Sequence, residues 1–389
     1  MKRGLFLLVI MALGLGACKK KKVNNLKTEF KENYAAIVHA SYEDALTEAI
    51  ELQTAINSFV DAPSEAGFTA AKEAWLAARE PYGQTEAYRF AGGPIDDEDG
   101  PEGALNAWPL DEGYIDYVEG DAATGIINDL DATIDAATLE GLNEVGGEKN
   151  ISIGYHAIEF LLWGQDDANT ALKTPGQRPY TDYLTDGSGT AANQDRRGTY
   201  LKVCAALLVG HLQLMVDEWK EGGAYRTTFI ALADDEAVAN ILTGMGVLGK
   251  SELAGERVFT ALDNQDQEDE HSCFSDNTHR DVITNFDGIY NIYKGSYTRV
   301  NGTVISGTGL SDIIEKADKK LNEELKELFE TCNTNVNAIP VPFDYALTLE
   351  TPGGSGAINS TVTNLRLLGD KIAEAGAELD LTINTDLPE

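Results

Sequence analysis

The sequence predicts an all-α fold, built mainly of helices that pack as antiparallel bundles. Apolar residues recur at intervals of three and four through most of the 389-residue chain, which is the helical period. One short stretch, 297–306, instead alternates β-branched and polar residues around Asn301-Gly302 and predicts a small β-hairpin. The segment 164–198 is rich in Gly, Pro, Thr and Asp, which indicates a boundary between two helical halves.

In the N-terminal half, apolar stripes predict a succession of helices and one long loop. The expected helices are 35–60, 64–82, 126–139 and 151–163. The second of them follows Pro63, and Ser64 is its expected N-cap. Residues 91–113 are rich in Gly, Pro and Asp, and long loops of this kind inside compact domains tend to carry function.

The C-terminal half has a stronger helical pattern. The expected helices are 199–221, 234–262, 278–294, 311–331 and 356–379. Their number and length favour bundle packing.

The amino terminus has the composition of a lipoprotein leader. A basic start is followed by a short apolar run, and Leu15-Gly16-Ala17-Cys18 has the form of a lipoprotein cleavage box. The run is too short to span a membrane, although an uncleaved anchor is the alternative. We therefore expect a membrane lipid attached through Cys18 and a place in the cell envelope, foremost the outer membrane, facing the periplasm or the surface. The predicted divisions are a signal peptide 1–17, a tether 18–27, an N-terminal bundle 28–165, a connecting loop 166–198 and a C-terminal bundle 199–389.

Charge and cysteine content narrow the classes of function. The formal net charge is −34, which argues against nucleic acid as a partner and favours attraction of cations. Apart from Cys18, only three cysteines remain, so the fold does not depend on a disulfide framework. If one pair closes, Cys273 with Cys332 is the expected one, because Cys204 lies in an apolar helical pattern typical of a buried thiol.

The strongest chemical signal is a histidine and a glutamate three residues apart in an apolar helix. His156 and Glu159 must share one helix face, and the surrounding pattern predicts that this helix is buried. A buried polar group without a partner costs roughly 1–3 kcal/mol, so both side chains should meet a metal, a ligand or other polar groups. The alternative is a His–Glu hydrogen bond that only orders the core.

Several sequence blocks resemble the imelysin-like family, in particular its iron-regulated branch. The stretch Gly154-Tyr155-His156-Ala157-Ile158-Glu159 is similar to the Gly-x-His-x-x-Glu signature of that family. The blocks 75–96, 106–112, 251–257 and 266–281 agree with the same resemblance. It implies two helical bundles related by a pseudo-twofold, with the functional site at their interface. It also implies a link to iron and raises the alternative of a metallopeptidase.

A tight metal site needs more donors than one His-x-x-Glu pair provides. Glu86 and Asp96 are the expected additional ligands, because they lie in the first of these blocks. The alternatives are an ion pair of Glu86 with Arg79 or Arg89, and a solvated acidic loop at Asp96. The residues expected to support or wall the pocket are Arg79, Tyr82, Trp108 and Trp163. Arg79 would orient the site by pairing with Glu159 or Glu86, and core packing is the alternative for the aromatic residues.

A second candidate cation site lies further along the chain. Glu268 precedes His271 by three residues, and Asp276 precedes His279 by three, an order found in helical di-iron carboxylate sites. Helix capping and surface ion pairing are the alternatives.

These observations predict an envelope lipoprotein that binds a metal ion, iron foremost and zinc as the alternative, or a metal-containing ligand. Its expected role is to assist iron uptake together with transporter components. A metallopeptidase using the same helix and a structural lipoprotein are the alternatives. Catalysis is the weaker prediction, because the familiar His-Glu-x-x-His zinc motif does not occur in the sequence.

Overall fold

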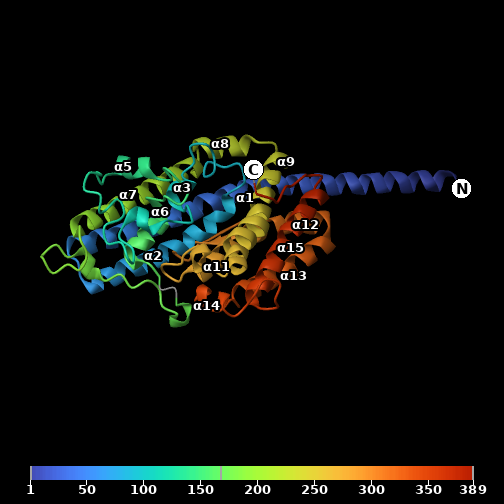
Figure 1. Cartoon of the computed structure of the whole chain (residues 1–389). Coiled ribbons are helices and arrows are strands. Elements are labelled where there is room, and N and C mark those ends of the chain that lie inside the picture. Colours follow the sequence, from blue (N-terminus) through green and yellow to red (C-terminus); the bar gives the residue numbers. More distant parts are fainter. Residues whose placement is uncertain (1, 167–168, 388–389) are drawn as a thin grey trace.

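The structure, a computed structural model, describes residues 2–166 and 169–387, with side chains from residue 20 onward, and it confirms the all-α prediction (Figure 1). Met1 and the side chain of Cys18, on which the leader and lipidation predictions depend, lie outside this description.

A long first helix is the axis around which the N-terminal part is built. Helix α1 (Lys2–Asp61) packs along α2 (Glu65–Thr85) and α7 (Gln194–Trp219), and its N-terminal end projects from the body of the molecule (Figure 1). Ser64 caps α2 as predicted, because its Oγ accepts a hydrogen bond from the Gly67 amide at 3.2 Å. The predicted tether 18–27 is a continuous part of α1, and it ends at the buried Lys27, whose ammonium donates to Asp235.

Short helices and irregular turns follow α2. These elements are the 3₁₀ turn Glu86–Tyr88, α3 (Glu102–Leu105), α4 (Glu112–Ile115), α5 (Ala136–Leu142), α6 (Gly154–Trp163), and the 3₁₀ turns Thr170–Leu172 and Tyr180–Tyr183. The predicted helix 126–139 is wrong, since only its end lies in α5. Gly125 has a φ of +89° and Asn128 turns its side chain onto the Thr124 carbonyl, so local turns replace the helix until Asp135 caps α5.

The C-terminal half contains the predicted helices with local interruptions. Their bounds are α8 (Ala224–Ala231), α9 (Asp234–Val247), the π-helix Leu248–Phe259, α10 (Thr260–Asn264), the 3₁₀ turn Gln267–Asp269, α11 (Thr278–Lys294), α12 (Leu310–Ala317), α13 (Lys319–Val336), α14 (Phe343–Leu347) and α15 (Ala357–Glu378). The expected helix 311–331 is divided at Asp318, whose carboxylate caps α13 by accepting from the amides of Lys320 and Leu321. The expected helix 234–262 is observed as α9 and α10 with the π-helix between them.

The predicted hairpin is confirmed. Strands β1 (Ser296–Thr298) and β2 (Val304–Ser306) pair antiparallel, with Tyr297 opposite Ile305. The Tyr297 hydroxyl donates to Asp44 of α1 at 2.9 Å, so the hairpin is fastened to the first helix.

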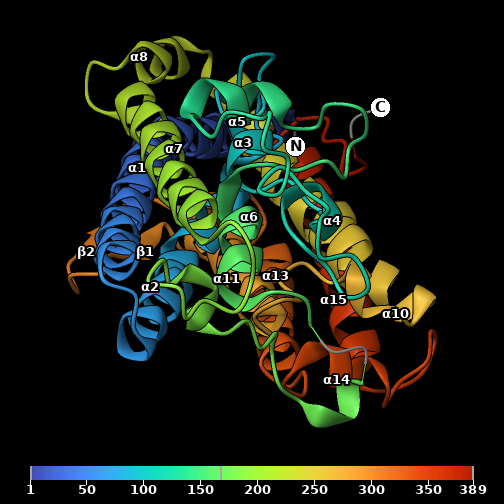
Figure 2. The ribbon, with the colours of Figure 1, turned by 60° about the vertical axis from the view of Figure 1, so that its left-hand side comes forward.

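The buried apolar side chains form one continuous core that extends from Phe30 to Leu379. Helix α1 contacts elements of both halves, including α2, α7, α9 and α12 (Figure 2). The pseudo-twofold relation between two bundles, and the domain limits, therefore stay predictions. Within the described residues, 194–231 is long and apolar enough to cross a membrane. Many apolar residues of α7 lie in the core, and core helices of other proteins meet the same criterion.

The expected Cys273–Cys332 disulfide is wrong. Cys204, Cys273 and Cys332 are all buried free thiols. Cys273 lies in the loop before α11, close enough to Glu268 and Glu159 for their charges to raise its thiol pKa further than burial alone does, whereas Cys332 lies in α13.

Candidate metal centre

The glycine that opens the His-x-x-Glu motif allows α6 to start against the chain that precedes it. Gly154 has a φ of +91°, and a Cβ at this position would lie 2.8 Å from the Leu105 carbonyl oxygen. Only glycine suits such a conformation and such a contact. Helix α6 is therefore placed against α3, with the side chains of His156 and Glu159 completely buried.

His156 and Glu159 bind each other, and a third residue fixes the glutamate. His156 Nδ1 lies 2.8 Å from Glu159 Oε2. The other oxygen, Glu159 Oε1, accepts from the Ser275 amide at 2.9 Å and from the Ser275 hydroxyl at 2.6 Å. Among the described residues, the buried His156 Nε2 has no hydrogen-bond partner. Burial raises the pKa of Glu159 to about 8, and burial, with His271 and Arg79, lowers the pKa of His156 well below its ordinary value.

A second buried histidine faces the first. The His271 ring lies edge-on to the His156 ring, with 4.7 Å between centroids. Its Nδ1 is 3.2 Å from Asp281 Oδ2, and its Nε2 is 3.4 Å from Asn106 Nδ2. Asn106 Oδ1 accepts from Arg79 at 2.6 Å, which assigns the amide nitrogen as the donor toward His271. The hydrogen-bond network therefore assigns the Nδ1–H tautomer to His271, with a lone pair on Nε2.

An arginine-paired cluster surrounds the two histidines. We use this name for the carboxylates of Glu86 and Asp281 with the guanidinium groups of Arg79, Arg89 and Arg257. Arg79 donates to Asp281 at 2.9 Å, and Arg257 donates to Glu86 at 2.5 Å. Burial alone would raise both carboxyl pKa values, but Arg257 and Arg89 lower the pKa of Glu86 to about 2, and Arg79 holds the pKa of Asp281 below its ordinary range. Both carboxylates are thus ionised and matched by cations.

A cavity of about 530 Å³ opens beside this group. Trp108, Asn106 and His271 line it, and the π-helix supplies Glu252 and Arg257. The carboxylates in its lining are Glu102, Glu144, Glu148, Glu252, Glu256 and Asp269, against the cations Arg89, Lys149 and Arg257. An excess of carboxylates concentrates cations near such an opening. The 251–257 block is therefore part of the cavity wall.

The structure places the expected metal ligands in different surroundings. His156 and Glu159 are together, but Glu86 is paired with Arg257, and Asp96 accepts from Arg89 at 3.1 Å and from the Phe90 amide at 2.7 Å. In the part of the chain that is described, neither acid is grouped with His156 at ligand spacing.

The predicted supporting residues also differ in their surroundings. Arg79 pairs with Asp281 and Asn106, so its expected partners Glu159 and Glu86 are wrong. Tyr82 packs on Tyr155 and Trp163 packs on Trp75, both in the core. Trp108 lies against His156 with 4.9 Å between ring centroids, and it reaches the cavity.

The four residues of the second predicted cation site do not come together. His271 belongs to the His156 centre, and Glu268 is an exposed residue lining another cavity. His279 is half-buried, with its Nδ1 3.1 Å from the Asp276 carbonyl oxygen. The Asp276 side chain lies in a different group, with Asp166 and Asp344.

Sequence reasoning missed the roles of Asn106, Ser275 and Asp281. Asn106 joins Arg79 to His271, Ser275 holds Glu159, and Asp281 holds both Arg79 and His271. All three lie inside the blocks that resemble known proteins, and that is the only signal that could have selected them. Their partners are 10 to 202 positions away along the chain.

The fold and the site together define an all-α protein with a buried Gly-x-His-x-x-Glu motif that faces a second histidine. Comparison with known proteins gives the family. The profile of the imelysin family matches residues 38–372, so this chain belongs to that family. It is 24% identical over 346 residues to iron-regulated protein A of Synechococcus elongatus, covering 86% of this chain and 82% of the relative.

Two solved structures share the fold. A crystal structure described as an iron-regulated protein A precursor from Parabacteroides distasonis superposes with a TM-score of 0.71 at 19% identity, covering 91% of this chain and 95% of the other. An imelysin-like protein from Psychrobacter arcticum gives a TM-score of 0.62 at 12% identity, covering 93% and 98%. At these identities the likeness supports the helical architecture alone.

Proposed function

We propose that this protein binds a metal ion, iron foremost, through His156 and His271, and that it assists iron uptake. One observation carries the proposal: two buried imidazoles face each other, and each has its Nδ1 held by a carboxylate. Metal-binding histidines commonly donate their other ring nitrogen to a carboxylate, which fixes the tautomer and the ring orientation. Glu159 and Asp281 take that orienting part. His156 Nε2 has no partner among the described residues, and the lone pair of His271 Nε2, which meets only the long 3.4 Å contact from Asn106, would turn to the metal.

The residues present fit a metal that prefers imidazole. His156 Nε2 is an orphaned buried nitrogen among the described residues, and such an atom without a partner costs roughly 1–3 kcal/mol. Imidazole suits both iron and zinc, and the iron preference is supported by the name of the cyanobacterial relative. Water from the cavity is available to complete the coordination.

The cavity also has room for a metal that arrives with an organic ligand. Its volume of about 530 Å³ lies within the usual range of small-molecule sites. Arg89, Lys149 and Arg257 in the wall could bind the anionic groups of such a ligand, while the surrounding carboxylates attract a free cation.

Metal titration of the purified, metal-stripped protein tests this assignment. Calorimetry with ferrous iron under anaerobic conditions, and with zinc, should show one site that His156→Ala and His271→Ala each weaken at least about tenfold. His211→Ala is the matched control, because His211 also lies beside a glutamate, Glu140 at 3.2 Å, but on α7. Wild-type binding in both folded histidine variants would contradict this assignment and place the metal elsewhere.

The same proposal includes anchoring to an envelope membrane through a lipid on Cys18. Its support is the basic start, the short apolar run and the small residues before that cysteine. A lipid-anchored metal binder would deliver its cargo to transporter components in the same membrane. Cys18→Ser should abolish lipid labelling and move the protein to the soluble fraction, and unchanged membrane partition of this variant would remove the anchoring part alone.

A further inference from the structure

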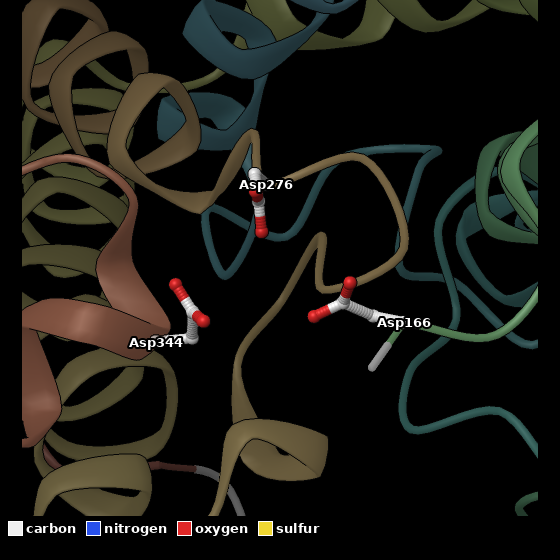
Figure 3. A group of neighbouring side chains, drawn as sticks. All are labelled: Asp166, Asp276 and Asp344. Carbon is white, nitrogen blue, oxygen red and sulfur yellow. The ribbon is translucent and has the colours of Figure 1, made fainter. Parts of the chain in front are cut away.

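Three aspartates from distant parts of the sequence converge outside the His156 centre (Figure 3). Asp166 follows the Gly164 C-cap of α6, Asp276 ends the loop before α11, and Asp344 lies in α14. Each offers one carboxylate oxygen, and these oxygens all lie within 4.8 Å of one another. In Figure 3 the three carboxylates point toward a common space.

Burial distinguishes this aspartate group from an ordinary acidic surface. Asp344 is only 2% exposed, and its Oδ1, like Asp276 Oδ1, accepts no hydrogen bond from the described residues. A buried carboxylate that is neither paired nor hydrogen-bonded is strongly disfavoured. The unpartnered Asp344 Oδ1 therefore points to a ligand that the protein chain does not itself supply.

A fourth buried acid lies close by. Glu270 is completely buried, and no described donor reaches either of its carboxylate oxygens with hydrogen-bond geometry. Burial raises its pKa well above the ordinary value; the Thr278 hydroxyl offsets part of this shift, and Asp344, Asp276 and Asp166 add to it. This region thus has an excess of negative charge over several elements.

Two basic side chains of this region make contacts outside the group. Burial raises the pKa of Asp344, and the backbone amides of Tyr345 and Asp344 and the charge of Lys173 offset only part of this shift. The Lys173 ammonium lies over the Tyr345 ring, 3.4 Å from the centroid. Arg178, in the wall of the cavity that reaches Asp166, donates to Asp116 at 2.6 Å. An added cation would balance the carboxylates.

The donors and their spacing select the kind of cation. All three are carboxylate oxygens, which hard divalent cations prefer. Oxygens within 4.8 Å of one another are close enough for one coordination sphere. Calcium binds oxygens at about 2.3–2.6 Å in irregular arrangements, whereas magnesium demands a near-ideal octahedron at about 2.1 Å, so ligands from three separate loops and helices favour calcium. The adjoining cavity of about 770 Å³ can admit the waters that complete a coordination shell.

We propose that Asp166, Asp276 and Asp344 form a calcium site that fastens the end of α6 and the loop before α11 to α14. This loop carries both His271 and Ser275, which contact His156 and Glu159. Calcium at the aspartate group would hold the loop in place, so this site supports the His156 centre without contacting its metal.

Calcium titration of the chelator-treated full protein tests the proposal. Calorimetry should show one calcium ion bound, at least about tenfold more tightly than magnesium. Asp344→Asn and Asp276→Asn should each weaken calcium binding at least about tenfold. Asp263→Asn removes an exposed carboxylate from α10 and should leave it unchanged, as should His156→Ala. Because His156→Ala removes the other centre, it separates failure of this proposal from failure of the iron assignment.

Thermal unfolding provides a second readout that a folding defect cannot imitate. In chelator, Asp344→Asn should melt at or above the wild-type midpoint, because it relieves repulsion among the acids, and it should lose the upward shift that calcium gives the wild type. Absence of calcium binding by the wild type, equal binding of magnesium, or wild-type affinity in the folded Asp344→Asn and Asp276→Asn variants would each overturn the proposal.

Discussion

The loop before α11 separates two acidic groups that differ in how their charge is balanced. On one side, the arginine-paired cluster holds Glu86 and Asp281 against guanidinium groups at 2.5–2.9 Å. On the other, the aspartate group brings carboxylate oxygens of Asp166, Asp276 and Asp344 within 4.8 Å of one another, and the buried Oδ1 atoms of Asp276 and Asp344 accept no hydrogen bond from the described residues. A buried acid already neutralised by arginine is a poor metal ligand, because binding would first have to break the ion pair. An acid such as Asp344, whose buried Oδ1 accepts no hydrogen bond from the described residues, is the better candidate for a cation.

The largest loss of stability is expected when an arginine is removed from the arginine-paired cluster. Arg79→Met would leave the buried Asp281 carboxylate without its strongest partner, and removal of one member of a buried pair costs about 3–5 kcal/mol. Urea denaturation should show this loss in the free energy of unfolding.

The double variant Arg79→Met/Asp281→Asn is the control for that experiment. It removes both charges and should be less destabilised than Arg79→Met alone, because no buried charge is left unpaired. A loss below about 1 kcal/mol in Arg79→Met would mean that water or another cation replaces the arginine, and that the cluster is not balanced in the way described.

How well the sequence predicts each part of the fold depends on how far apart along the chain the interacting residues lie. Periodicity located α2, α6, α11 and the hairpin, because their signals are local. It failed at 126–139, where Gly125 and the Asn128 side chain favour turns over a helix that the apolar pattern alone would allow. Capping residues such as Ser64 could be read directly, since their partners are three residues away.

The candidate sites required information that spacing does not contain. The His156–Glu159 pair was predictable because three residues bring both side chains to one helix face. The partnership of His271 with His156 was not, and neither was the choice between Glu86 as a metal ligand and Glu86 as an arginine partner. That choice depends on Arg257, which lies 171 residues further along and reaches Glu86 only in the folded chain. The same holds for Asp166, Asp276 and Asp344, whose separation in sequence gives no local pattern.

A smaller change in the free energy of unfolding, with a defined pH dependence, is expected from Glu102 beside the arginine-paired cluster. Burial raises the pKa of Glu102 to about 7, although Arg89 lies 2.9 Å away. Since the folded pKa is above the unfolded value of 4.5, the folded state binds the extra proton between these values, and stability from this group increases as the pH falls from 7 to 4.5.

Glu102→Gln should lack this contribution. Relative to wild type, its free energy of unfolding should be higher at pH 8 than at pH 4.5 by about 1–3 kcal/mol, measured by urea denaturation at both pH values. If this difference between the two proteins does not change with pH, or changes in the opposite direction, Glu102 is ionised in the folded protein at neutral pH, like Glu86.

The smallest effect is expected from an ion pair that joins the same two helices as Arg79 and Asp281. Arg280 of α11 donates to both carboxylate oxygens of Glu80 of α2, at 2.7 and 2.6 Å, so the pair has excellent geometry. Its side chains are 35% and 42% exposed, against 2% for both members of the Arg79–Asp281 pair. Exposed pairs contribute about 0–1 kcal/mol because water solvates the separated charges almost as well.

Arg280→Met should therefore lower the free energy of unfolding by less than about 1 kcal/mol. Most of that loss should disappear in 1 M salt, whereas the loss in Arg79→Met should persist in salt. Equal losses in the two variants would show that burial is not what separates these neighbouring pairs, and the distinction drawn between balanced and unbalanced acids would need another basis.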